Sequence, residues 1–126
     1  KPINTFVASF IGNPPMNLIR GKIKDSSFLS KNIQIKNFKH SNNQYILGFR
    51  AEDATITGGN IGNITGPIFS IELLGDSVMV TVKIENCLIS VKMSNTYVAS
   101  IGDEVSISVL STKCQIFDYE TGLNIN

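Results

Sequence analysis

The stretch that decides the fold class is Val78-Met79-Val80-Thr81-Val82-Lys83-Ile84. Its even-numbered positions carry Val or Ile and its odd-numbered positions carry Met, Thr or Lys, a period of two that is typical of a β-strand. The even positions are therefore expected to face the core. The short polar connection Gly75-Asp76-Ser77 joins this stretch to the apolar segment 67–74, and this spacing predicts a β-hairpin.

Further short strands are predicted on both sides of this hairpin. They cover residues 17–24, 28–29, 32–35, 45–49 with a possible extension over 54–57, 87–93, 104–110 and 115–117. The chain contains 18 Ile, 8 Val and 8 Thr against 4 Ala, and side chains branched at Cβ favour strands over helices. Seven or more short strands with regular turn signals predict an all-β fold, a small barrel or a sandwich.

One short amphipathic helix is predicted at the N-terminus. In the segment 4–12, Phe6 lies over Phe10 and Val7 over Ile11 at a spacing of four residues. Pro14 and the proline after it end the helix, because proline lacks the amide donor that a helix needs. A helix of two turns needs a surface to cover, so these four apolar side chains are predicted to pack on another domain.

Length and charge narrow the function classes. With 126 residues the chain is expected to form one domain, and a net charge of +1 gives no global attraction for nucleic acid or an anionic membrane. No apolar run reaches the length of a membrane helix, and the chain is expected to be soluble and cytosolic. Cys87 and Cys114 are expected to be reduced and buried.

The sequence contains few residues that could serve catalysis or bind a metal. The glycine-rich stretch 58–66 is interpreted as a flexible loop, since a phosphate-binding loop ends in Gly-Lys-Ser/Thr and no lysine occurs between Arg50 and Lys83. His40 is the only histidine and sits among polar residues, so a solvated loop histidine is expected. We therefore predict no enzymatic activity, no metal and no cofactor within this chain.

Four segments together resemble one family. The segment 1–17 is similar to the junction between the ATPase domain and the C-terminal regulatory domain in the ATP-binding subunits of maltose- and glycerol-phosphate-type sugar ABC importers. Residues 47–53 resemble that family's Leu-Gly-Ile-Arg-Pro-Glu-His segment, with Ala51 and Asp53 at the proline and histidine positions. Residues 72–75 resemble its Glu-x-Leu-Gly element, and residues 115–122 resemble its terminal His-Leu-Phe-Asp…Thr-Gly, with Gln115 at the histidine position.

The resemblance implies a fold, a division of the chain and a function. It implies a small OB-like Greek-key barrel of the transport-associated (TOBE) type over residues 17–126, preceded by the tail and linker of an ATPase domain over residues 1–16. It also implies a non-catalytic regulatory and dimerisation domain, with ATP and Mg²⁺ bound only by the ATPase domain of the parent subunit. The expected partners are a second subunit, the membrane permease subunits and a regulatory protein or small effector, at the cytoplasmic face of the cell membrane.

Candidate contact residues lie in these segments. Interface or effector contacts are predicted at Arg50, Glu52, Glu72, Leu74 and Gly75, with the alternative that these residues only shape turns, and packing on the ATPase domain is predicted at Phe6, Val7, Phe10 and Ile11.

Two other functions remain open. The first is a module that senses a small oxyanion or sugar through backbone amides near residues 58–66. The second is a single-stranded nucleic-acid binder, for which Phe38 and Tyr45 beside the lysines of the first third would supply stacking. The near-neutral charge argues against nucleic acid as a partner.

Overall fold

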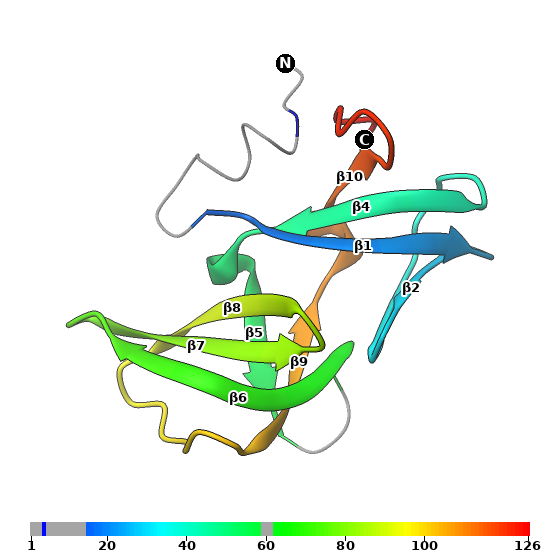
Figure 1. Cartoon of the computed structure of the whole chain (residues 1–126). Coiled ribbons are helices and arrows are strands. Elements are labelled where there is room, and N and C mark those ends of the chain that lie inside the picture. Colours follow the sequence, from blue (N-terminus) through cyan, green and yellow to red (C-terminus); the bar gives the residue numbers. More distant parts are fainter. Residues whose placement is uncertain (1–3, 5–14, 59–61) are drawn as a thin grey trace.

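The computed structural model of the chain describes residue 4 and residues 15–58 and 62–126 (Figure 1). Nearly all regular structure in this part of the chain is β, which confirms the all-β prediction. The strands are β1 (Asn17–Lys24), β2 (Ser27–Ser30), β3 (Ile33–Lys36), β4 (Asn43–Phe49), β5 (Ala54–Thr57), β6 (Ile64–Leu73), β7 (Ser77–Ile84), β8 (Cys87–Ser94), β9 (Glu104–Val109) and β10 (Gln115–Asp118). Two short 3₁₀ helices, η1 (Ala51–Asp53) and η2 (Ser111–Lys113), join strands.

The strands form one curled antiparallel sheet in the order β10-β4-β1-β2-β3-β6-β7-β8, and β9 joins β5 to β6. The sheet curls into a half-barrel, consistent with an OB-like barrel (Figure 1). Ile64, at the start of β6, pairs with Ile33 of β3 on one side and with Ile107 of β9 on the other. This residue is the point at which the two halves of the sheet meet.

The Asn17 side chain links β1 to β8 across the barrel. Its Nδ2 donates to the Ser90 carbonyl at 2.9 Å, and its Oδ1 accepts from the Ser90 amide at 2.8 Å. The side chain thus pairs with β8 as a strand backbone would, and it is itself buried. A buried asparagine is stable here because its amide is satisfied on both sides.

The core lies inside the curl, where alternate residues of facing strands meet. The even positions of β7 (Val78, Val80, Val82 and Ile84) are all buried, as the period of two predicts, although Met79 between them is buried as well. Phe28, Phe49 and Ile116 are fully buried. The outward-facing Lys22 and Lys24 of β1 are exposed.

Two predicted boundaries need correction. Residues 54–57 do not extend β4; they form a separate strand because η1 turns the chain and β5 pairs with β9. The predicted loop 58–66 is shorter than expected, since Ile64, Thr65 and Gly66 belong to β6 and pair with β9. The predicted N-terminal helix, including Phe6, Val7, Phe10 and Ile11, lies outside the described residues.

Among the described residues, no helix has the length and the apolar character that crossing a membrane requires.

Candidate functional site

The predicted contact residues occupy two separate places. Arg50 is half-buried and precedes η1, and Glu52 is exposed within η1, while Ala51 between them is buried. The second group lies at the end of the β6–β7 hairpin, which Figure 1 shows away from the start of β5, where η1 ends.

The hairpin group is shaped by a tight turn. The Leu74 amide donates to the Ser77 carbonyl at 2.9 Å, and Gly75 has a φ of +88°, which glycine adopts without strain. Glu72 and Leu74 are both exposed. The turn therefore presents these side chains to solvent, and the two groups of predicted contact residues do not form one site.

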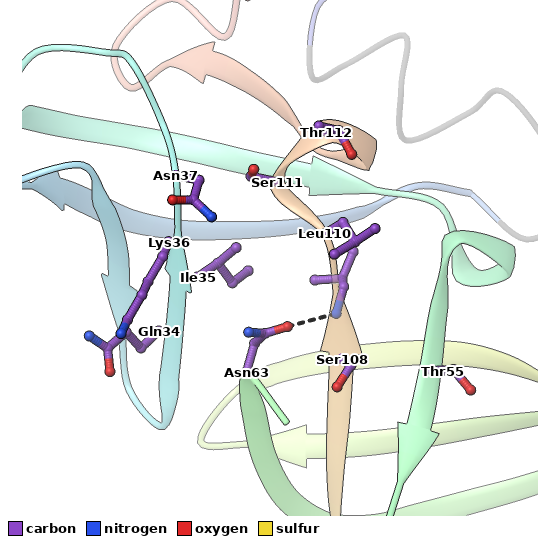
Figure 2. A pocket seen from close by; sticks show the side chains of 11 residues that line it. Gln34, Ile35, Lys36, Asn37, Thr55, Asn63, Ser108, Leu110, Ser111 and Thr112 are labelled. Atoms are coloured by element: carbon purple, nitrogen blue, oxygen red, sulfur yellow. Dashed lines mark hydrogen bonds between the residues drawn. The ribbon is translucent and has the colours of Figure 1, made fainter. Parts of the chain in front are cut away.

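A groove lies between β3 and the end of β9 (Figure 2). Its volume is about 730 Å³. Most of its lining side chains are amides and hydroxyls, and none is a carboxylate; the lining consists of Gln34, Ile35, Lys36, Asn37, Thr55, Asn63, Ser108, Val109, Leu110, Ser111 and Thr112. A lining of this kind offers hydrogen bonds rather than acid–base chemistry.

The groove lies at the N-terminal end of β6, where this strand begins between β3 and β9. The Gln34 amide donates to the Asn63 carbonyl at 2.9 Å, and the Asn63 amide donates to the Ile107 carbonyl at 2.7 Å, so Asn63 still fits between β3 and β9 as a strand residue. Gly62, which precedes Asn63, lies against the backbone of Ile107. A Cβ on residue 62 would come to 2.7 Å from the Ile107 carbonyl oxygen. The backbone of β3 beyond Gln34 and the end of β9 therefore border the groove.

The Asn63 side chain has a defined orientation in this groove. Its Oδ1 accepts from the Val109 amide at 2.7 Å, the bond drawn in Figure 2. Because the oxygen faces this donor, the NH₂ group is on the other side, and Figure 2 shows its nitrogen toward the β3 side of the groove. A fixed hydrogen-bond donor thus points into the groove, where a ligand with acceptor oxygens can use it.

A second cavity of about 410 Å³ continues the groove, and the two share Asn37, Ser111 and Thr112. His40 lines it and corrects a prediction. This histidine is half-buried rather than solvated, its ring lies 5.7 Å from the Tyr45 ring, and its Nδ1 is buried with no hydrogen-bond partner among the described residues. The His40 ring is partly shielded from solvent because it packs against the Tyr45 ring.

The known proteins that are similar to this chain are longer than it, and almost the whole chain aligns with one part of each. The protein YcjV of Escherichia coli O157:H7, an uncharacterized ABC transporter ATP-binding protein, is 31% identical over 137 residues, covering 99% of this chain and 38% of YcjV. The putative ABC transporter ATP-binding protein MG187 of Mycoplasma genitalium is 27% identical, covering 96% of this chain and 21% of its own length. Both of these relatives of the chain are therefore ABC transporter ATP-binding proteins by name.

A further ABC homologue has a stated cargo. The multiple sugar-binding transport ATP-binding protein MsmK of Streptococcus mutans is 30% identical, covering 96% of this chain and 36% of MsmK. The chain thus spans between 21% and 38% of the length of these ABC transporter ATP-binding proteins. No family model matches the chain.

Both thiols are free, as predicted from the cysteine count, but only Cys114 is buried; Cys87 is half-buried. Burial, together with a smaller effect of the Asp53 carboxylate, raises the pKa of the Cys114 thiol to about 12. Burial also raises the pKa of the Cys87 thiol. Raised thiol pKa values keep both sulfurs protonated and unreactive at neutral pH.

Sequence reasoning missed the groove in this relative of ABC transporter subunits. It pointed to residues 58–66, and Asn63 is in that range, but Gln34, Asn37, Ser108 and Ser111 come from segments that carry no motif. These residues meet only through the pairing of β3 and β9 with β6. The one available signal was the polar composition of residues 36–44.

Proposed function

We propose that this chain is a non-catalytic regulatory and dimerisation domain in the ATP-binding subunit of an ABC importer of the sugar or glycerol-phosphate type. The observation that carries the proposal is the coverage: ABC transporter ATP-binding proteins match almost the whole chain, and the chain spans only 21% to 38% of them. The remainder of such a protein has room for the ATPase domain. The phosphate-binding loop that ATP chemistry needs is not among these 126 residues.

Two further observations support the proposal. The ATP-binding subunit MsmK, whose name specifies sugar transport, aligns over 96% of the chain. The all-β half-barrel is the fold that the family resemblance implies. In the parent complex the domain holds two subunits together while their ATPase domains open and close, which raises the effective concentration of each ATPase domain for the other. The subunit then lies at the inner face of the membrane, against the permease subunits.

Deletion of residues 17–126 from the full-length subunit tests this role. We expect the shortened subunit to bind ATP as before and to lose self-association in sedimentation equilibrium. Unchanged self-association after the deletion would contradict a dimerisation role. Loss of ATP binding by the shortened, folded subunit would contradict a non-catalytic one.

A second candidate function is the sensing of a small oxyanion or sugar in the groove. The observation that favours it is the Asn63 NH₂ group, fixed by the bond to Val109 and directed into a groove without lining carboxylates. Oxyanions and sugars both carry the acceptor oxygens that such a donor binds. A cavity of about 730 Å³ lies within the ordinary range for small-molecule sites.

Calorimetry of the chain with molybdate, sulfate and maltose, each up to about 10 mM, tests the second function. Binding that disappears in Asn63→Ala and persists in the exposed-turn control Asn86→Ala would support it. No heat with any of the three compounds would reject it.

A further inference from the structure

The outer half of β6 has one edge that no strand covers. Residues 64–67 of β6 pair with β9 on this edge, and at Ile68 the edge is occupied by the segment before β9, through bonds of 2.9 Å from Ile68 to Asp103 and from Gly102 to Ile68. Beyond Ile68, no hydrogen bond joins this edge to another of the described residues. The opposite edge of the same residues pairs with β7.

The hydrogen-bond alternation of the hairpin identifies the groups at the free edge. The Leu74 amide bonds to Ser77 of β7, and in an antiparallel ladder every second residue does the same. Glu72 and Ser70 therefore direct their backbone groups toward β7. Ile71 and Leu73 direct theirs to the opposite, uncovered edge.

Two of the five side chains in residues 69–73, Phe69 and Leu73, are apolar and exposed, while Ile71 is half-buried. Phe69 is 50% exposed and Leu73 is 80% exposed, and the neighbouring loop between β8 and β9 adds Val98 at 90% and Ile101 at 68%. Strand edges in soluble proteins are usually protected by lysine, proline or a covering segment. Residues 69–73 contain no lysine and no proline, so this edge is open to strand pairing.

We propose that the edge of β6 at residues 69–73 pairs antiparallel with the same edge of a second copy of this chain, about a two-fold axis at Ile71. In this register the outward N–H and C=O groups of Ile71 bond to those of the second copy's Ile71, the pairing that a symmetric dimer requires. Glu72 then lies opposite Ser70, so the two Glu72 carboxylates do not face one another. The two β6-β7-β8 units become one continuous six-stranded sheet.

The second copy is the occupant that these features favour. In the two-fold register about Ile71, the single charge in the stretch 69–73 falls opposite a hydroxyl, so the pairing brings no two like charges of this stretch together. The inference rests on the proposed dimerisation function and names the surface that performs it. It also assigns a role to Glu72, predicted from sequence as an interface residue.

Sedimentation equilibrium of the 126-residue chain tests the pairing. We expect a monomer–dimer equilibrium in which Leu73→Lys raises the dimer dissociation constant at least about tenfold, or 1.4 kcal/mol. Leu73 is largely exposed, so this change leaves the fold intact. Leu110→Lys, which changes another exposed leucine away from the edge, is the matched control and should leave the equilibrium unchanged.

Amide hydrogen exchange gives a second readout that does not depend on a variant. Exchange at Ile71 should slow as the chain concentration rises, while exchange at Glu72, already bonded to β7, should not change. A monomeric chain at about 1 mM, an unaltered equilibrium in Leu73→Lys, or concentration-independent exchange at Ile71 would overturn the inference.

The full-length subunit separates this inference from the proposed function. If deletion of residues 17–126 abolishes self-association and Leu73→Lys does not weaken it, the β6 edge is not the interface, and the dimerisation role stands. If the deletion has no effect, the dimerisation role itself fails.

Discussion

Replacing Asn17 by alanine should weaken the closure of the barrel. The change removes the bonds of 2.9 Å and 2.8 Å to the Ser90 backbone. It leaves the Ser90 amide and carbonyl without these partners. An unsatisfied buried polar group costs about 1–3 kcal/mol, and Ser90 is half-buried, so water replaces part of the loss. We therefore expect the free energy of unfolding to fall by about 2–4 kcal/mol, a large share of the 5–15 kcal/mol typical of a domain.

Urea unfolding followed by far-ultraviolet circular dichroism measures this loss as a lower midpoint at an unchanged slope. The matched control is Asn42→Ala, which removes an exposed bond of 3.0 Å from the Asp25 amide. The control should cost less than about 1 kcal/mol, because water replaces an exposed partner. A loss below about 0.5 kcal/mol in Asn17→Ala would refute the bridging role, since a satisfied buried amide cannot be removed at so low a cost.

Three other changes follow from the same reasoning. Asn63→Ala should lower the urea midpoint by the equivalent of about 1–3 kcal/mol, because the Val109 amide loses its partner; an unchanged midpoint would contradict that bond. Gly21→Ala should destabilise by about 1–3 kcal/mol in thermal unfolding, since a Cβ there would meet a backbone oxygen at 2.6 Å, while Gly58→Ala, with open space, should not. The Cys114 thiol has a pKa of about 12 in the fold against 9.0 ordinarily, so the unfolding free energy should fall as pH rises above 9. Cys114→Ala should flatten that slope in urea titrations between about pH 8 and 10.5, and an equal slope in both proteins would contradict it.

Local chemistry made most of the strands predictable. The alternation in β7 leads directly to its buried even positions, because successive side chains of a strand point to opposite faces. The turn after β10 also depends on local chemistry: the Asp118 carboxylate accepts from the amides of Glu120 and Thr121 at 2.9 and 2.7 Å, within the turn itself.

The remaining features depend on contacts between residues far apart in the sequence, and local sequence patterns do not predict them. Asn17 reads as the first residue of a strand, and nothing in its neighbours indicates a bond to a residue 73 positions away. His40 reads as solvated because its sequence neighbours are polar, whereas its burial depends on the Tyr45 ring. The groove likewise exists only because β6 begins between β3 and β9. This feature of the topology cannot be predicted from the composition.

The groove and the free edge use different halves of strand β6, so the ligand and dimerisation proposals can be tested independently. Asn63 adjoins the first residue of β6, and the free edge begins at Phe69, after a break in the pairing register between Ile68 and Ser70. A β-bulge at this point interrupts the ladder locally, and β9 together with residues 102–103 holds the strand in place between the two sites. Asn63→Ala should therefore leave the dimer equilibrium unchanged, and Leu73→Lys should leave the heat of ligand binding unchanged. If either variant alters the other measurement, strand β6 transmits changes between the two sites, and the groove reports its occupant to the dimer interface.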